Sequence, residues 1–115
     1  MRKPGLITLF KFPQVDLAVG KLRPALILGK IPGQFDDWLI CMISSQMEQY
    51  NSELDEILQT SDSDFVKSGL KSKSLIRVGR LAVVDGKILL GAVGEIDSER
   101  LFQIKKRLAN WLLKK

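Results

Sequence analysis

Three short apolar runs, separated by stretches typical of loops, predict three strands in the first 44 residues. The runs at 6–12, 25–29 and 38–44 are short and mostly apolar, and the first is apolar on both faces of an extended chain. Runs of this kind are typical of strands near the centre of a small barrel. Pro24 stands at the opening of the second strand, where its missing N–H breaks no ladder hydrogen bond.

Two further strands are expected in the second half of the chain, over residues 75–84 and 87–93. Asp85 and Gly86 lie between them, and an Asp-Gly pair favours a two-residue hairpin, since both turn positions require positive φ. The two strands are therefore expected to pair with each other.

The stretch between residues 45 and 74 is polar, acidic and rich in serine. Residues 56–58 are consistent with a short strand, and residues 62–67 with a helical turn that Gly69 ends. Residues 13–21 and 31–34 each contain proline and glycine, so we expect loops there.

Residues 98–115 carry the clearest period, and it is helical. Basic residues at 105–107 lie opposite an apolar stripe, and Asp97 or Ser98 is placed to cap the start of the helix. The stripe is expected to pack against the core, and it consists of Leu101, Ile104, Leu108, Trp111 and Leu112. Five or six short strands and a C-terminal amphipathic helix predict a mainly-β or α+β protein with an antiparallel, barrel-like sheet.

Length and composition exclude several classes of protein. With 115 residues, a single domain spanning 1–115 is expected. No apolar run approaches the ~18–20 residues of a membrane span, and the N-terminus leads into no secretory stretch. The single cysteine, Cys41, has no partner for an intrachain disulfide, which agrees with a soluble protein of the reducing cytoplasm.

The sequence contains no histidine, and this restricts its chemistry further. Histidine is the usual general base near neutral pH and the commonest zinc ligand. Paired-histidine ribonuclease chemistry, serine–histidine triads and tetrahedral zinc sites are therefore excluded, and neither a metal nor another cofactor is expected. An enzyme of this composition relies on arginine, lysine, carboxylates, hydroxyls, backbone or water.

The net charge of +5 is unevenly distributed. Residues 1–35 carry +5, residues 36–64 carry −8 with no basic side chain, and residues 65–115 carry +8. The two basic parts would attract a polyanion if they folded onto one face. Basic side chains scattered over a solvated surface would give the same sum, so charge alone leaves both interpretations open.

Lys21-Leu22-Arg23-Pro24 is the first candidate for chemistry. A loop brings Arg23 to the rim of the predicted sheet, and the following proline fixes the direction of the backbone. An arginine held in this way can fork onto a phosphate through two charge-assisted hydrogen bonds. The alternative is an ion pair between Arg23 and Asp16 or Glu95.

Two further groups lie at strand ends. A buried strand ends in Ser44, with Ser45 and Gln46 directly after it, and hydroxyls at a strand end either donate to phosphate oxygens or cap the next turn. Residues 71–77 place several anion-binding groups where a loop enters a strand, although such a stretch is often only a solvated basic segment. These groups are Lys71, Lys73, Ser74 and Arg77.

The order of these features resembles the MazF/PemK-like toxins of bacterial toxin–antitoxin pairs, from Gly5 to the end of the final helix. The matching motifs, in chain order, are Gly5-Leu6-Ile7-Thr8-Leu9, Phe12-Pro13, Lys21-Leu22-Arg23-Pro24-Ala25, Ile43-Ser44-Ser45-Gln46, the block 69–77 that ends in Arg77, and Leu89-Leu90-Gly91-Ala92-Val93-Gly94. The resemblance implies an SH3-like barrel, a homodimer, and a metal-independent, sequence-selective endoribonuclease that cleaves single-stranded RNA without the ribosome. The implied reaction is attack of a ribose 2′-OH on the adjacent phosphorus, which leaves a 2′,3′-cyclic phosphate and a 5′-OH.

The resemblance also implies roles for individual residues. Arg23 matches the arginine expected to stabilise the charge developing on the phosphoryl oxygens. Ser44 replaces a threonine that hydrogen-bonds the scissile phosphate, and Arg77 matches a second arginine that acts as a proton donor or a phosphate clamp. Because the pKa of arginine is above ~12, electrostatic stabilisation suits Arg77 better than proton transfer. RNA-binding roles are expected for Lys21, Ser45, Gln46, Lys71, Lys73 and Ser74.

One departure from the family pattern leaves a second function open. Gly79 stands where some relatives carry an aspartate, so a carboxylate is missing two residues after Arg77. The alternative is a non-catalytic module on the same barrel that binds nucleic acid or inhibits a protein such as a topoisomerase.

The expected protein partner is a cognate antitoxin whose acidic, partly disordered segment covers the basic groove and mimics RNA. The chain's own acidic stretch, 36–64, is expected to lie away from that groove.

Overall fold

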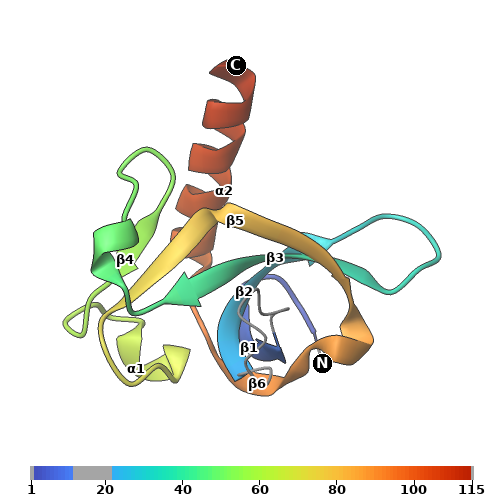
Figure 1. The fold of residues 1–115 in the computed structure, drawn as a ribbon, viewed down its shortest axis with the longest axis horizontal. Coiled ribbons are helices and arrows are strands. Elements are labelled where there is room, and N and C mark those ends of the chain that lie inside the picture. Colours follow the sequence, from blue (N-terminus) through green and yellow to red (C-terminus); the bar gives the residue numbers. More distant parts are fainter. Residues whose placement is uncertain (1, 12–21, 115) are drawn as a thin grey trace.

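The computed structural model describes residues 2–11 and 22–114, and these form a six-stranded antiparallel sheet that curls into a half-barrel (Figure 1). The fold confirms a barrel-like sheet with a C-terminal helix. The strands are β1 (Leu6–Lys11), β2 (Leu22–Lys30), β3 (Asp37–Ser44), β4 (Glu56–Leu58), β5 (Ser74–Asp85) and β6 (Leu90–Glu95). The helices are η1 (Met47–Gln49), α1 (Phe65–Ser68), η2 (Gly86–Ile88) and α2 (Ser98–Lys114).

The predicted hairpin at Asp85 and Gly86 is wrong. The strand order is β4-β5-β3-β2-β1-β6, so β6 pairs with β1 at the far edge of the sheet instead of with β5. Asp85 has a φ of −67°, and its side chain accepts a hydrogen bond from the Lys87 amide at 2.9 Å, which starts η2. The Gly86 amide donates to the Asp36 carbonyl at 2.8 Å. These contacts carry the chain away from β5, where a hairpin would reverse it.

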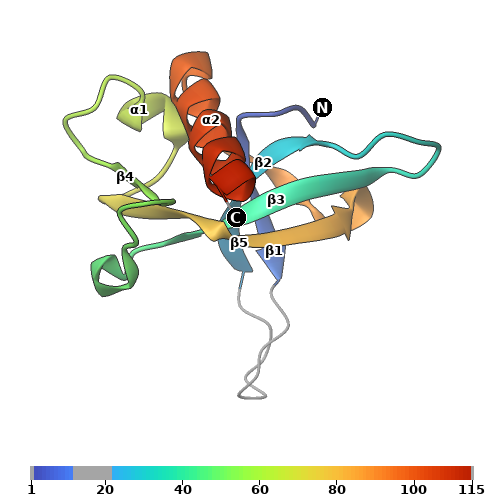
Figure 2. The ribbon, with the colours of Figure 1, turned by 90° about the horizontal axis from the view of Figure 1, so that it is seen from above.

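Two apolar clusters of described residues lie on opposite faces of the sheet. The inner cluster fills the curl of the half-barrel and contains Phe10, Ala25, Ile27, Trp38, Ile40 and Leu89. The outer cluster lies beneath α2, which crosses the outside of the sheet (Figure 2), and contains Ile7, Leu26, Leu28, Cys41, Ile43, Ile76, Val78, Ile96 and Ile104.

The C-terminal helix is confirmed, but its apolar stripe is only partly core. Ile104 is fully buried, and Leu101 and Leu108 pack against the outer cluster. Leu112 is 58% exposed, so its predicted place in the core is wrong. The last turns of α2 extend past the sheet that covers its first half. No helix among the described residues has the length and apolarity needed to cross a membrane.

The short helix α1 lies against β6 through close backbone contact. Gly69 ends α1, as expected, with a φ of +73°. A Cβ atom at Gly69 would overlap the carbonyl oxygen of Val93, and one at Gly94 would overlap the carbonyl of Lys67. Glycine is therefore needed on both sides of this contact.

We expect Gly69→Ala to lower the free energy of unfolding by more than about 2 kcal/mol, because it adds a steric clash to an unfavourable left-handed φ. Gly91→Ala is the matched control, since Gly91 has a φ of +64° and an added Cβ would have no neighbouring atom within 4 Å. The control should lose about 1 kcal/mol, the backbone cost alone. Urea unfolding of both variants measures the difference, and equal losses would contradict the proposed contact.

Candidate phosphate-binding site

The register of three neighbouring strands places Arg77 on the inner face of the sheet. Met42 on β3 pairs with Arg77 on β5 and with Ala25 on β2. Directly opposed residues of an antiparallel ladder project from the same face. Ala25 and Met42 belong to the inner cluster, so Arg77 shares its face.

Arg23 and Ser44 lie one step further along the same face. Each is two residues from a member of the pair Ala25–Met42, and side chains two residues apart in a strand share a face. Because β2 and β3 run antiparallel, continuing their register sets Arg23 opposite Ser44. The fold therefore brings the three predicted catalytic residues to one end of one sheet face.

The two arginines have no carboxylate partner among the described residues. Arg23 is exposed, and Glu95, one of its two possible partners, pairs with Lys3 at 3.6 Å. The other possible partner, Asp16, lies outside the described residues. Arg77 is half-buried, and its Nε is buried without a hydrogen-bond partner in the described part of the chain. Neither guanidinium group is thus paired with a described carboxylate.

The hydroxyl of Ser44 takes part in the turn that follows β3. Its oxygen accepts a hydrogen bond from the Gln46 amide at 3.0 Å, which matches the capping alternative. Its donor contact, to Gln49 Oε1, is long at 3.4 Å and exposed to solvent. The hydroxyl proton of Ser44 can therefore be redirected to a phosphate oxygen. Ser45 and Gln46 are exposed beside it.

The other predicted RNA-binding residues differ in exposure. Lys71 and Lys73 are exposed in the loop before β5 and have no ion pair with a described residue. Ser74 is buried, and its hydroxyl donates to the Ser72 carbonyl at 2.8 Å, so this proton holds the entry to β5. Lys21 lies outside the described residues.

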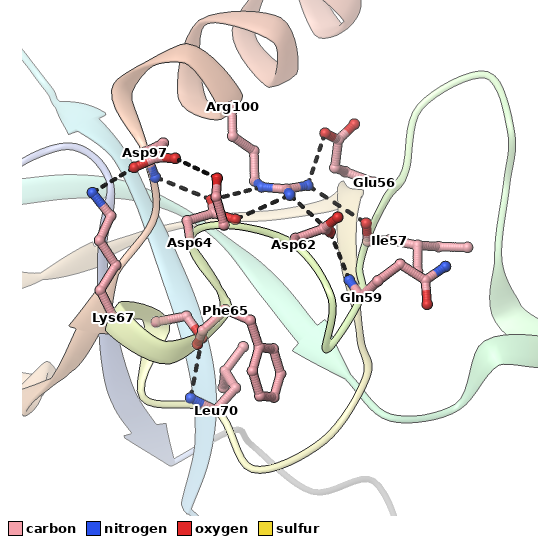
Figure 3. Close-up of polar contacts among 12 residues, drawn as sticks. Glu56, Ile57, Gln59, Asp62, Asp64, Phe65, Lys67, Leu70, Asp97 and Arg100 are labelled. Atoms are coloured by element: carbon pink, nitrogen blue, oxygen red, sulfur yellow. Dashed lines mark hydrogen bonds and ion pairs between the residues drawn. The ribbon is translucent and has the colours of Figure 1, made fainter.

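The acidic segment lies against α2, where Arg100 contacts three carboxylates (Figure 3). Arg100 binds Glu56 at 3.1 Å, Asp62 at 2.9 Å and Asp64 at 2.8 Å. This cluster was missed at the sequence level, where Arg100 is one more basic residue on a helix. The signal in the sequence was the run of eight acidic residues between 36 and 64 with no basic residue among them. Such a run needs cations from elsewhere in the chain wherever it is buried.

Two further basic residues of α2 extend the same pairing. Arg107 binds Glu56 at 2.9 Å, and Lys114 binds Glu53 at 2.8 Å. Four of the five acidic residues from Glu53 to Asp64 thus pair with cations of α2 (Glu53, Glu56, Asp62 and Asp64). Arg23 and Arg77, on the opposite face, have no carboxylate partner among the described residues.

Asp64 is the most deeply buried member of the Arg100 cluster. Burial alone would raise the pKa of Asp64, but hydrogen bonds from Arg100 and the Asp97 amide, together with the charge of Arg100, hold it below its usual value. Burial would lower the pKa of Arg100, whereas its bond to Asp64 and the charges of Asp64, Glu56 and Asp62 raise it. Both groups therefore stay ionised at neutral pH.

Comparison with known proteins agrees with this fold. The structure is similar to the Mycobacterium tuberculosis toxin MazF-mt6, with a TM-score of 0.67, 14% identity, and coverage of 91% of this chain and 93% of that chain. It is similar to MazE-MazF from Deinococcus radiodurans, with a TM-score of 0.73, 18% identity, and coverage of 99% and 97%. A third likeness is to an endoribonuclease in complex with its cognate antitoxin from a mycobacterial species, with a TM-score of 0.66, 13% identity, and coverage of 97% and 95%.

The family model of the PemK-like, MazF-like toxins of type II toxin–antitoxin systems matches residues 3–112. The curated proteins give no significant sequence match. The chain therefore belongs to the PemK-like, MazF-like toxin family, as the sequence motifs indicated.

Replacement of Asp64 with asparagine tests the Arg100 cluster. At neutral pH we expect Asp64→Asn to lower the free energy of unfolding by about 1.5–3 kcal/mol, the value of a hydrogen bond to a charged group. Because the folded pKa of Asp64 is lowered, its contribution is present above the unfolded pKa of about 3.9 and is lost as pH falls through the folded pKa. Urea unfolding of both proteins at neutral and acidic pH should show the difference shrinking in acid. A difference independent of pH would contradict the ion pair.

Proposed function

We propose that this chain is the toxin of a toxin–antitoxin pair and acts as a metal-independent, sequence-selective endoribonuclease on single-stranded RNA. The observation that carries the proposal is the meeting of Arg23, Ser44 and Arg77 on one sheet face, where neither arginine is paired with a described carboxylate. Two guanidinium groups and a hydroxyl are donors suited to a phosphodiester. Membership of the toxin family supports the same activity.

The proposed reaction needs a nucleophile from the RNA itself. The 2′-OH loses its proton to water and its oxygen bonds to the adjacent phosphorus, while the bond from phosphorus to the 5′-oxygen breaks and that oxygen takes up a proton from water. The products are a 2′,3′-cyclic phosphate and a 5′-OH. Negative charge grows on the non-bridging oxygens during this step, and preorganised donors such as Arg23 and Arg77 stabilise it. Ser44 orients the phosphate, and Lys71 and Lys73 attract the flanking backbone.

Gly79 bears on whether the protein cleaves RNA or only binds it, because a carboxylate is missing at this position. It is exposed two residues after Arg77, and the nearest atom to an added Cβ is Leu54 Cδ1 at 3.2 Å, the end of a flexible side chain. The two arginines can bind a phosphate without a carboxylate at position 79. Such phosphate contacts position the RNA whether or not it is then cleaved. We assign charge stabilisation, and not carboxylate catalysis, to this site.

Incubation with long single-stranded RNA in EDTA tests the proposal. We expect discrete cuts with 5′-OH ends, slowed about 100-fold or more by Arg23→Ala, because one charge-stabilising donor is lost. Lys106→Ala is the matched control, since it removes the same charge from an exposed position on α2 and should cut at the wild-type rate. RNA retained in a gel shift without any cut would leave a non-catalytic binding module in place of the enzyme.

We also propose that two copies of the chain associate through an apolar surface at the end of α2. Leu112 lines a groove with Leu39 and Leu108, and Val83 pairs with Leu39 across β3 and β5. Val83 is 55% exposed, and at the end of α2 Leu112 is 58% and Leu113 85% exposed. A second copy would bury this surface.

The dimer is tested by Leu112→Glu and Val83→Glu, each of which puts a charge into that surface. Light scattering after gel filtration should give twice 12.9 kDa for the wild type and the monomer mass for both variants. Val66→Glu is the control, because Val66 is 89% exposed on α1, and it should stay dimeric. A monomeric wild type would refute the association.

The proposed protein partner is an antitoxin with an acidic segment that occupies the inner face and competes with RNA for Arg23 and Arg77. The D. radiodurans neighbour is a MazE-MazF structure and the mycobacterial one is a complex with a cognate antitoxin. Unpaired cations on this face give such a segment its charge complement. Location in the cytoplasm follows from the proposed RNA substrate.

A further inference from the structure

β5 departs from regular geometry directly after Arg77. Met42 pairs with Arg77, but its neighbour Cys41 pairs with Leu81, so residues 78–80 are bulged out of the ladder. β4 pairs only with residues 74–76 of β5 and does not reach the bulge. The amide of Val78 is therefore left without a strand partner on either side.

The carboxylate of Asp55 fills that gap. Asp55 is 4% exposed, and its Oδ1 accepts a hydrogen bond from the Val78 amide at 3.0 Å. Its Oδ2 accepts from the Asn51 amide at 3.0 Å. One buried carboxylate thus joins the loop after η1 to the bulge in β5.

The loop that carries Asp55 is itself tightly held. Asn51 Oδ1 accepts from the amides of Glu53 and Leu54, at 2.9 and 3.3 Å. The carbonyl of Asp55 accepts from Arg107 Nη1 at 2.6 Å, which ties the loop to α2. Asp55 therefore reaches the bulge from a rigid support.

Arg77 depends on its backbone for its position. Its Nε is buried, and no described residue accepts a hydrogen bond from it. A side chain without a polar partner is directed by its backbone and by packing. The next residue is Val78, whose amide Asp55 holds, so the contact that fixes the bulge also fixes the base of the Arg77 side chain.

From this geometry we propose that Asp55 is a positioning residue for Arg77. It touches neither RNA nor the reacting phosphate, and it acts by holding the bulge that directs the guanidinium onto the inner face. The inference rests on the proposed function for its catalytic readout, and it adds a supporting residue that the family motifs do not include. A merely structural role for Asp55 would lower stability and leave the folded enzyme's kinetics unchanged.

The test is a double-mutant cycle on Asp55 and Arg77, in which the rate of RNA cleavage is measured for each variant. A thermal melting curve first shows that each variant is folded. Asp55→Ala should lower kcat about 10- to 100-fold with KM changed less than about threefold, because a displaced donor affects the transition state most. Asp55→Asn keeps an oxygen for the Val78 amide and should lie between wild type and alanine. In an Arg77→Ala background, Asp55→Ala should have no further effect, since it acts through Arg77.

Asp64→Asn is the matched control, because Asp64 is also a buried carboxylate that accepts a backbone amide, that of Asp97 at 3.1 Å. It should cost stability and leave kcat unchanged. Equal slowing by Asp55→Ala with and without Arg77, or no slowing in either background, would overturn the inference.

A second readout separates this inference from the proposed function. Amide hydrogen exchange at Val78 and Gly79 should be accelerated more than about 10-fold in Asp55→Ala and unchanged in Asp64→Asn. If the wild type binds RNA without cutting it, the proposed function fails. The double-mutant cycle is then repeated with the affinity for RNA as the measured quantity. Unchanged exchange at Val78 would overturn the inference whether or not RNA is cut.

Discussion

The antiparallel ladder between β2, β3 and β5 is the constraint on which the candidate site depends. Its register sets Ala25, Met42 and Arg77 in one row and continues to Arg23 and Ser44 at the end of the same face. A shift of one residue in any of the three strands would turn its side chains to the outer face. The buried clusters on the two faces oppose such a shift, because every side chain of the shifted strand would have to repack against the cluster on the other face.

The fold also keeps the acidic segment and the two site arginines on different faces of the sheet. α2 crosses the outer face and brings Arg100, Arg107 and Lys114 to the acidic segment that ends in Asp64. This pairing holds Glu53, Glu56, Asp62 and Asp64 against α2. The arginines of the inner face remain without a described carboxylate, which is the electrostatic condition for binding an external polyanion such as RNA.

Much of the fold could be predicted from local patterns. Short apolar runs placed the strands, the period of 3.6 residues placed α2, and Gly69 placed the end of α1, because each depends on residues close in sequence. The hairpin prediction failed because an Asp-Gly pair specifies a tight turn only when the flanking strands are neighbours. Here the Asp85 side chain caps η2 and the Gly86 amide is taken by Asp36.

The candidate site, like the fold, could be predicted only in part from the sequence. Arg23, Ser44 and Arg77 were found from motifs, and the register accounts for their shared face. Arg100 and Asp55 were not found, since the contact of Arg100 with Asp64 and that of Asp55 with Val78 each join residues more than 20 positions apart, and no local pattern marks such contacts. The exposed end of α2 was also missed, because helical spacing shows that a stripe exists but not how far the sheet extends beneath it.

The central claim is that Arg23 and Arg77 bind the same stretch of RNA on the inner face. NMR of the arginine Nε–Hε groups tests it most directly, during titration with single-stranded RNA that carries 2′-deoxyribose in place of the reactive ribose. The account predicts that the signals of Arg23 and Arg77 shift together and saturate at one RNA concentration, while those of Arg100 and Arg107 stay in place. Shifts at Arg100 or Arg107 with none at Arg23 and Arg77 would contradict it.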